Sequence, residues 1–426
     1  MMRTENLLAE IIDGHTEPWL WHEDRALSGR QLVSRLTPRT DDRGGMRLVR
    51  ATSAVAAVIG VLRALSAGAT PILWPYRLAV PDWLAAALRP ETPAATRLAE
   101  LLRGDVGRVI GVCSSGTSSG TAKVVFLDVR RMWSNAQAIA ARLSASGPVD
   151  VVASLRSPAY AAGLVGDVLA SLASGSTVWC PSVSVPEIAI GQMTAVPVRA
   201  VHCTAAVARR VVTALPAALD RIVLSGDMVT PGVVRPLAAA VPRAALWTGY
   251  GLAEAGPRVA MGQLESGSSA GHAGRLLDGV AGHLVDGELV VSTPFGATAA
   301  LGPAGPYQIH GDAIRTGDLA ILAPDGTIRI RGRRAGALPS PAGVVAAEEV
   351  EACIEATGVE AQVYAGPGGW QIDLAQGTGA DVETTILRLV LANFPHLPVP
   401  TIREVPTLPV TDAGKRSSSL TQRPGP

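Results

Sequence analysis

Short apolar runs rich in valine, isoleucine and leucine alternate with longer amphipathic segments over the first 250 residues of the chain. The short runs are typical of buried strands, and the longer segments have the length and spacing of helices. This alternation predicts a doubly wound α/β body. The expected strands are 46–49, 70–73, 109–112, 124–127, 149–155, 177–179, 200–203, 221–224 and 244–248, and the expected helices are 5–12, 28–36, 51–67, 94–102, 131–144, 162–173, 206–215 and 233–240.

The pattern changes after about Gly271, where short strands are separated by glycine and proline. Asp325-Gly326 is a hairpin turn signal between two of these strands, so we expect an antiparallel β-lobe attached to the body. Beyond Gly332 the pattern predicts a small α+β domain. The expected strands of the β-lobe are 288–292, 320–322 and 327–331. In the small domain, the expected strands are 361–364, 371–374 and 401–405, and the expected helices are 346–357 and 381–393.

The length supports more than one domain, because 426 residues exceed a usual single core. We expect a large domain over residues 1–332 and a small domain over residues 333–426. Lysine plus arginine is 37 and aspartate plus glutamate is 36, so the net charge of +1 gives no reason to expect a nucleic acid or an anionic membrane as a partner.

Four cysteines lie far apart, without the spacing of a zinc site or a disulfide framework. They favour a reducing, cytoplasmic location. The N-terminus does not have the pattern of a signal peptide, and the longest apolar run, 54–62, is too short to span a bilayer. The cysteines are Cys113, Cys180, Cys203 and Cys353.

The segment Val112–Phe126, VCSSGTSSGTAKVVF, has the composition of a phosphate-binding loop. Small residues let backbone N–H groups face one ligand, hydroxyl groups add donors, and a lysine at the exit adds positive charge. A flexible serine-glycine linker is the structural alternative, but a linker does not require a lysine between two strands. The candidate phosphate-binding residues are Ser114, Ser115, Gly116, Thr117, Ser118, Ser119, Gly120 and Lys123.

Five further polar islands follow in order along the chain. They are Ser225–Asp227, Tyr250–Glu254 (YGLAE), Gly287–Leu289, Arg315–Leu319 (RTGDL) and Pro409–Lys415 (PVTDAGK). Together with the serine-rich loop, they make the chain resemble the adenylate-forming superfamily of acyl-CoA synthetases, peptide-synthetase adenylation domains and luciferases. The resemblance spans nearly the whole chain and implies a small C-terminal domain that is mobile.

The resemblance implies a site for ATP and Mg²⁺. Lys123 and its loop would hold the β- and γ-phosphates, and Glu254 would hold Mg²⁺, which favours carboxylate and phosphate oxygens. Tyr250 would stack on adenine, and Asp318 would accept hydrogen bonds from the ribose hydroxyls. Lys415 would reach the substrate carboxylate and the α-phosphate. The other implied nucleotide contacts are Gly226, Asp227, Gly251 and Arg333.

The acyl pocket is expected near Tyr160 and Gly163, because many relatives place a histidine and a glycine there. Ser225, Trp247 and Gly249 would lie nearby. Two bulky aromatic side chains predict a short pocket for a small or aromatic carboxylic acid. The alternative is that both aromatics belong to the core.

Three positions depart from the family pattern. Ala122 replaces a proline before the loop lysine, Ala253 replaces a threonine, and Ala335 stands where the hinge of the small domain usually carries an acidic residue. The lysine that the resemblance assigns to the first half-reaction, the adenylation step, is present as Lys415. The acceptor in the second half-reaction stays open between CoA, a carrier-protein thiol and an amine.

Each candidate also has a structural interpretation when taken alone. Asp318 could be a turn residue, Glu254 a helix cap, Tyr250 a core residue and Lys415 a solvated charge. Their occurrence in one order favours ATP-dependent activation of a carboxylic acid as acyl-AMP, with release of pyrophosphate. The other hypotheses are a degenerate nucleotide-binding scaffold and an enzyme that adenylates a substrate other than a carboxylate.

Overall fold

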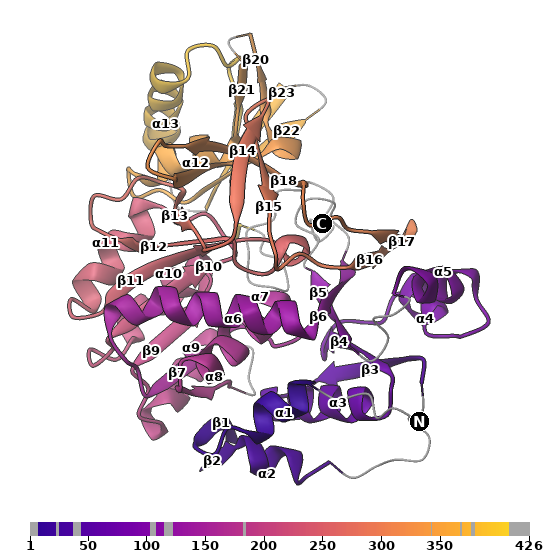
Figure 1. Cartoon of the computed structure of the whole chain (residues 1–426). Coiled ribbons are helices and arrows are strands. Elements are labelled where there is room, and N and C mark those ends of the chain that lie inside the picture. The colour runs from indigo at the N-terminus through magenta and orange to yellow at the C-terminus, as the bar shows by residue number, and fades with distance from the viewer. Residues whose placement is uncertain are drawn as a thin grey trace.

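The computed structural model is an α/β structure with two large β-sheets and helices packed against them (Figure 1). Most of the parallel strands of both sheets are short runs of aliphatic residues that are almost completely buried. The structure describes residues 7–22, 25–36, 44–102, 108–114, 122–181, 185–341, 343–366, 369–375 and 380–408.

The first sheet contains the parallel core of the body. Strands β8, β7, β9, β10 and β11 pair in parallel in that spatial order. β1 pairs in parallel with β8, and β2 pairs antiparallel with β1. The strands are β1 (Pro18–His22), β2 (Arg25–Ser28), β7 (Val151–Ser154), β8 (Thr177–Trp179), β9 (Ala200–Cys203), β10 (Arg221–Ser225) and β11 (Ala245–Tyr250).

The β-lobe continues the same sheet beyond β11. Strands β12, β13, β19, β18, β15 and β14 pair antiparallel in that spatial order. The predicted turn joins β18 to β19, and Gly326 has the positive φ of 81° that such a turn requires. The strands are β12 (Ala260–Leu264), β13 (His272–Leu276), β14 (Ala281–Val285), β15 (Glu288–Ser292), β18 (Ile314–Leu322) and β19 (Thr327–Arg333).

The second sheet contains the predicted phosphate hairpin. β3, β4 and β5 are parallel, and β5 and β6 pair antiparallel across the serine-rich loop. β16 and β17 extend this sheet beside β6. The strands are β3 (Met46–Ala51), β4 (Thr70–Pro75), β5 (Val109–Ser114), β6 (Lys123–Asp128), β16 (Ala299–Gly302) and β17 (Gly305–Gln308).

Helix boundaries in the body follow local capping signals. Ser53 accepts a hydrogen bond from the Ala56 backbone N–H at 3.1 Å and begins α3, and Gly68 follows its end with a φ of 72°. Asp128 caps α6 through the N–H of Arg130 at 2.8 Å. The helices are α1 (Leu7–Asp13), α2 (Gly29–Val33), α3 (Ala54–Ser66), α4 (Asp82–Ala87), α5 (Pro93–Leu101), α6 (Val129–Leu143), α7 (Ala161–Gly163), α8 (Ala170–Ala173), α9 (Pro186–Gln192), α10 (Ala205–Val211) and α11 (Pro231–Ala240).

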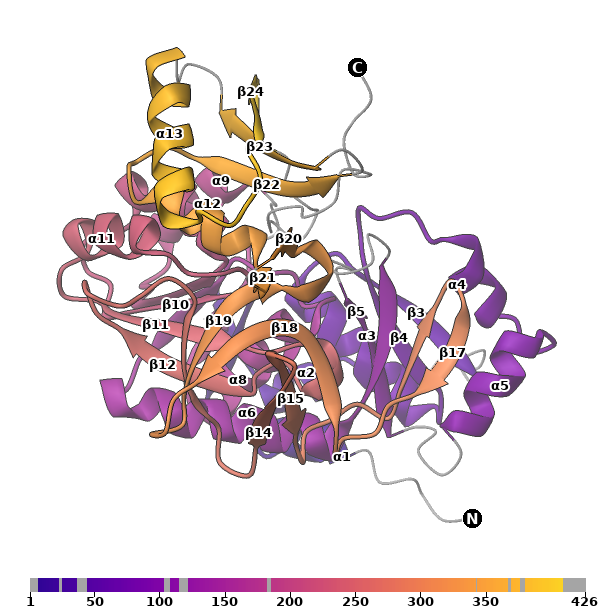
Figure 2. The ribbon, with the colours of Figure 1, turned by 90° about the horizontal axis from the view of Figure 1, so that it is seen from above.

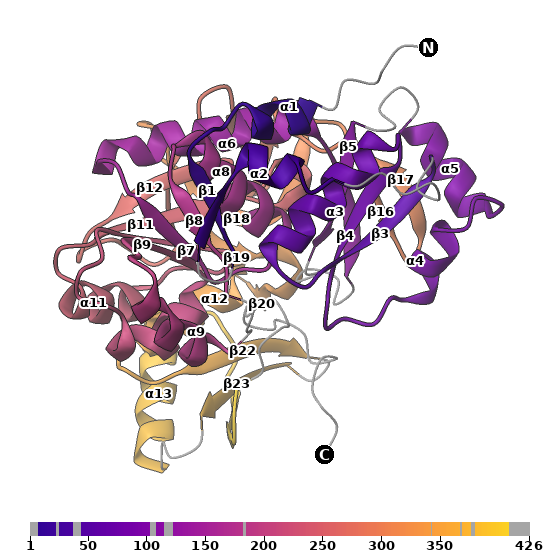
Figure 3. The same ribbon diagram turned by 90° about the horizontal axis from the view of Figure 1, so that it is seen from below.

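One large core joins the N-terminal helices to the body. Leu8 of α1, Leu32 of α2 and Val58 of α3 are buried in the same cluster as Ile139 of α6 and Leu164. α1 contacts α6, and α2 contacts α1 and α3 (Figure 3). The same cluster contains residues of both sheets, such as Val112 and Val223, so burial of these side chains stabilises the packing between the sheets.

The C-terminal part forms a separate small core. Strands β22, β23 and β24 form a three-stranded sheet that packs with α12 and α13, and α12 contacts β19 and α11 (Figure 2). The elements are β20 (Leu338–Ser340), β21 (Gly343–Val345), α12 (Ala347–Glu355), β22 (Ala361–Gly366), β23 (Gly369–Ala375), α13 (Ala380–Asn393) and β24 (Thr401–Val405).

Three of the differences between the structure and the sequence prediction lie near the N-terminus or the site. The predicted helix 28–36 is only Gly29–Val33, although Ser28 caps it as expected. The predicted helix 162–173 is interrupted by a π-helical segment, Leu164–Leu169. The hairpin β1–β2 was not predicted, because β1 pairs with β8, which is distant in the chain.

Within the described residues, no helix has the length and apolar character needed to cross a membrane.

Candidate active site

The phosphate hairpin places Lys123 beside Glu254. Ser114 ends β5, Lys123 begins β6, and the two are direct register partners. The ammonium group of Lys123 forms an ion pair with the Glu254 carboxylate, which lies on a short 3-10 turn, Ala253–Ala255, after β11. Burial lowers the pKa of Lys123, but Glu254 and then Tyr307 outweigh this effect, so the pKa is raised. Lys123 is therefore charged at neutral pH.

The rest of the predicted loop and the predicted C-terminal lysine lie outside the described residues. Their roles stay predictions. These residues are Ser115, Gly116, Thr117, Ser118, Ser119, Gly120 and Lys415.

The chemistry of Glu254 fits a magnesium ion that is shared with phosphates. In the described part of the chain, no group of three or more His, Cys, Asp or Glu side chains could hold a metal on its own. Mg²⁺ commonly uses one or two carboxylates together with substrate phosphate oxygens and water, so a single carboxylate at a cavity wall is sufficient.

A second polar group forms at the β-lobe. Tyr250, at the end of β11, donates its hydroxyl to Oδ2 of Asp318 at 2.6 Å. Nε of Arg333 lies 3.1 Å from Oδ1 of Asp318, and its Nη1 donates to the Thr316 carbonyl at 3.2 Å. Asp318 and Arg333 are register partners on β18 and β19. Burial and then Asp318 raise the pKa of Tyr250, so its hydroxyl stays protonated.

These two groups line adjoining cavities. The larger cavity, of about 1210 Å³, is lined by Ser114, Lys123 and Glu254, and the smaller one, of about 160 Å³, by Tyr250 and Asp318. Asp227 also lines the smaller cavity. The structure thus brings the described nucleotide-binding candidates to one continuous region, because both cavities are lined by Gly226, Gly251 and Arg333.

The predicted acyl residues separate into two groups. Tyr160, Gly163 and Ser225 line the larger cavity, and Gly249 lines the smaller one. Trp247 lines neither of them and is buried in the main core. The prediction that two aromatic side chains shorten the pocket therefore depends on Tyr160 alone.

Two arginines that the sequence interpretation missed line the same end of the larger cavity. Arg156 follows β7, and Arg258 precedes β12. The position of Arg156 carried a usable signal, because ligand-binding residues often follow the carboxyl ends of parallel strands. Arg258 carried no such signal, since its side chain reaches the cavity by packing against the glycines Gly166 and Gly249.

A buried carboxylate lies behind Arg156. Asp167, on the π-helical segment, is 0% exposed and accepts hydrogen bonds from Nε of Arg156 at 2.8 Å and from the Ser154 hydroxyl at 2.6 Å. Nδ1 of His202 lies 3.0 Å from the same carboxylate. Burial raises the pKa of Asp167, but Arg156 and His202 outweigh it and hold the pKa well below its usual range. Burial lowers the pKa of His202, so this ring is neutral at pH 7.

Arg258 is buried without a comparable partner. It is 3% exposed, and its Nη2 and Nη1 donate to the Ser225 hydroxyl at 2.7 Å and to the Pro257 carbonyl at 2.8 Å. Burial, and then Arg156, lower the pKa of Arg258 to about 9. The guanidinium group is still charged at pH 7.

The altered hinge is held by the β-lobe. Ala335 lies in a 3-10 turn, Arg334–Gly336. Nη1 of Arg334 donates to the Asp286 carbonyl at 3.1 Å and lies 3.8 Å from the Glu288 carboxylate. Arg334 thus connects the predicted hinge segment to the β-lobe.

A family comparison agrees with this geometry. Residues 108–307 match the model of the family described as AMP-binding enzyme. This range contains the phosphate hairpin, Glu254 and the segment Ser225–Asp227. A search of the curated proteins found no match.

Solved structures share the fold over nearly the whole chain. The anthranilate CoA ligase AuaEII, in complex with anthranoyl-AMP, gives a TM-score of 0.77 at 15% identity and covers 96% of this chain and 95% of its own. The o-succinylbenzoate coenzyme A synthetase MenE from Bacillus subtilis, in complex with AMP, gives 0.76 at 15% identity, with 98% of both chains covered. The amide bond synthetase McbA from Marinactinospora thermotolerans gives 0.74 at 18% identity, with 96% of this chain and 98% of its own covered.

The two findings together confirm the resemblance drawn from the motifs. Residues 108–307 match the AMP-binding enzyme family, and the whole chain has the fold of the solved ligases named above. The predicted fold class, a large α/β body with a β-lobe and a small C-terminal α+β domain, is also confirmed.

Proposed function

We propose that the protein activates a small or aromatic carboxylic acid with ATP and transfers the acyl group to a thiol or an amine. In the first step, a carboxylate oxygen bonds to the α-phosphorus of ATP, and the bond to the bridging oxygen breaks with its electron pair leaving on pyrophosphate. In the second step, sulfur or nitrogen bonds to the acyl carbon, its proton goes to solvent, and AMP leaves with the electron pair of the C–O bond.

One observation carries this proposal. The ion pair Lys123–Glu254 and the group Tyr250–Asp318–Arg333 line two cavities that share wall residues. A triphosphate at the first group and a ribose at the second would be parts of one nucleotide. Catalysis of this kind depends on positive charge and donors placed around phosphates before the reaction begins.

Each group has a defined role in the proposal. Lys123 would release Glu254 and bind phosphate oxygens, and Glu254 would then hold Mg²⁺, which neutralises phosphate charge when bound. Asp318 would accept hydrogen bonds from the ribose, because each carboxylate oxygen can accept more than one. Tyr250 would contact the adenine, and Lys415 would stabilise the charge that develops at the α-phosphate.

The acceptor is proposed only as a nucleophilic thiol or amine. The similar structures include CoA ligases and an amide bond synthetase. The arginine-anchored hinge leaves CoA, a carrier-protein thiol and an amine as candidates for this chain.

Trapping with hydroxylamine tests the proposal directly. Purified protein is incubated with ATP, Mg²⁺, hydroxylamine and a panel of small aliphatic and aromatic acids, and acyl hydroxamates are measured. We expect hydroxamate formation that depends on ATP and on at least one acid. Absence of hydroxamate and of pyrophosphate exchange with every acid, while ATP still binds, would contradict the proposal and support a nucleotide-binding scaffold.

A further inference from the structure

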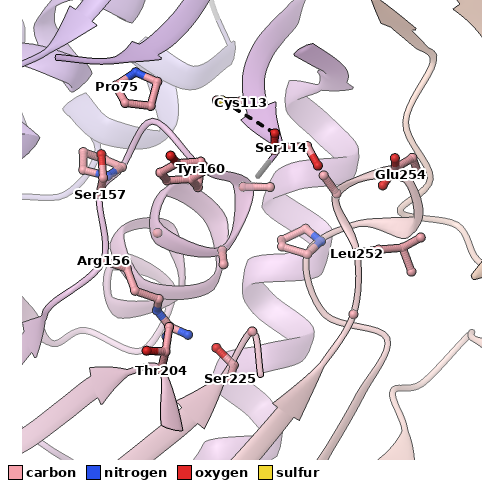
Figure 4. A pocket seen from close by; sticks show the side chains of 18 of the residues that line it. Pro75, Cys113, Ser114, Arg156, Ser157, Tyr160, Thr204, Ser225, Leu252 and Glu254 are labelled. Carbon is pink, nitrogen blue, oxygen red and sulfur yellow. Dashed lines mark hydrogen bonds between the residues drawn. The ribbon is translucent and has the colours of Figure 1, made fainter. Parts of the chain in front are cut away.

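The larger cavity has a positively charged end away from the phosphate hairpin. Figure 4 shows Arg156 pointing toward Thr204 and Ser225, with Ser114 and Glu254 on the other side of the view. Arg258 joins this end through its hydrogen bond to Ser225. We call the group formed by Arg156, Thr204, Ser225 and Arg258 the inner end of the cavity.

The charges at the inner end do not balance. Asp167 supplies one negative charge, and its carboxylate is already bound to Arg156, Ser154 and His202. Arg258 is charged at pH 7 and His202 is neutral, and arginine guanidinium groups in general are not deprotonated in proteins. In the part of the chain that the structure describes, no carboxylate lies within 4.0 Å of Arg258. Arg156, Arg258 and Asp167 together thus carry a net charge of +1.

One donor at the inner end also has no acceptor. Nη1 of Arg156 is buried and has no hydrogen-bond partner among the described residues, and the side chain of Arg156 is only 7% exposed. A buried donor without an acceptor is costly, and the cost is higher when the group is charged. Since Arg156 and Arg258 both line the cavity, a ligand in the cavity can supply the missing acceptor and the missing negative charge.

We infer that the inner end binds a second carboxylate of the acyl substrate, so the preferred acid is a small aliphatic or aromatic dicarboxylic acid. One carboxylate reacts with ATP near Lys123, and the other stays ionised against Arg258 and Nη1 of Arg156. A carboxylate matches a guanidinium group in charge and geometry and can accept from both arginines. This inference rests on the proposed function and names the substrate class of the same site.

Matched pairs of acids test the inference. ATP–pyrophosphate exchange is measured with succinate against butyrate, glutarate against pentanoate, and isophthalate against 3-methylbenzoate, which differ mainly in the second carboxylate. We expect the dicarboxylic acid of at least one pair to have a kcat/KM at least tenfold higher than its partner. A methyl group in place of the carboxylate leaves both arginines without their acceptor.

Substitutions test whether Arg258 causes the preference for the dicarboxylic acid. Arg258→Met keeps the length of the side chain and removes its charge, and we expect it to abolish the preference by lowering kcat/KM for the dicarboxylic acid at least tenfold. Arg210→Met is the matched control, because Arg210 lines the same cavity but is paired with Glu187 on the surface. This control should keep the preference. Arg258→Gln replaces Arg258→Met if the latter does not fold.

The outcomes separate the two proposals. Exchange with monocarboxylic acids and no preference for the second carboxylate would overturn the inference and leave the proposed function standing. A preference that persists in Arg258→Met or Arg258→Gln would also overturn it, and both arginines would then be structural partners of Asp167. Absence of exchange with all the acids, with ATP still bound, would refute the proposed function and the inference together.

Discussion

At the residue scale, the pair Lys123–Glu254 connects the sequence motif to the proposed chemistry. The two side chains neutralise each other in a partly buried position, where they are 22% and 13% exposed. A charge held in this way is available to a phosphate without a large rearrangement of the backbone. The pair therefore makes a specific prediction about ATP binding.

Lys123→Met should lower kcat/KM for ATP in pyrophosphate exchange by about 100-fold, equivalent to about 2.7 kcal/mol, because a charged hydrogen bond to phosphate is lost. Arg97→Met is the control, since Arg97 is exposed and pairs with Glu100 on α5. The control should have wild-type kinetics. Wild-type kcat/KM in Lys123→Met would refute the role of this lysine in binding phosphate.

The sequence identified site residues that belong to local motifs. Lys123 follows a serine-rich loop, Glu254 follows YGLA, and Asp318 stands in RTGDL, so each is recognisable from a few neighbours. Arg156 and Arg258 could not be assigned in this way, because the inner end forms only when β7, the residues before β12 and the π-helical segment meet. Trp247 was assigned to the pocket by its position along the chain, but its side chain points into the core.

At the element scale, local sequence patterns predicted where the strands lie better than they predicted which strands pair with one another. The alternation of strands and helices predicted the parallel strands of both sheets. It did not predict the division into two sheets, because that division depends on contacts between residues far apart in the chain. The π-helical segment Leu164–Leu169 was also missed, since its extra residue per turn leaves no clear signature.

The π-helical segment carries Asp167, and this carboxylate makes a prediction about stability. Asp167→Asn should lower the free energy of unfolding at pH 7 by about 3–5 kcal/mol, because it breaks a buried ion pair with Arg156. Asp220→Asn is the control, since the pair Arg199–Asp220 is partly exposed and should contribute at most about 1 kcal/mol. Urea unfolding measures both. Equal effects of the two substitutions would contradict the account of the cluster.

The same cluster predicts how the free energy of unfolding changes as the pH falls. The pKa of Asp167 is lowered on folding, so its contribution is full above its ordinary value of 3.8 and is lost as the pH falls below it. The pKa of His202 is also lowered, so stability begins to fall as the pH drops through 6.5. Asp167→Asn should remove the part of this pH dependence that lies below pH 3.8, as measured by urea unfolding. If the free energy of unfolding of Asp167→Asn depends on pH in this range as it does in wild type, the proposed contribution of Asp167 is wrong.

At the scale of the whole molecule, the small domain contacts the nucleotide region through α12. Oε2 of Glu348 accepts a hydrogen bond from the Arg333 backbone N–H at 3.2 Å, next to Asp318. Burial, and to a smaller extent Asp318, raise the pKa of Glu348 to about 7. This carboxyl therefore couples the packing of the small domain to pH.

Glu348 changes the free energy of unfolding with pH in the opposite direction to Asp167. A carboxyl whose folded pKa is raised contributes stability below its ordinary value of 4.5, and that contribution is lost as the pH rises through 7. Wild type should lose on the order of 1–2 kcal/mol between pH 5.5 and pH 8, and Glu348→Gln should remove this loss. Urea unfolding of the full chain at both pH values measures it. Glu349→Gln, which alters the neighbouring pair with Arg331, should keep the wild-type pH dependence.

The central claim is that one nucleotide occupies both cavities, and a crystal structure of the protein with ATP and Mg²⁺ tests it most directly. The account predicts the triphosphate at Lys123, the metal at Glu254 and the ribose hydroxyls at Asp318. Nucleotide bound elsewhere, or bound with the ion pair Lys123–Glu254 still closed and Asp318 out of contact with the ribose, would contradict the account.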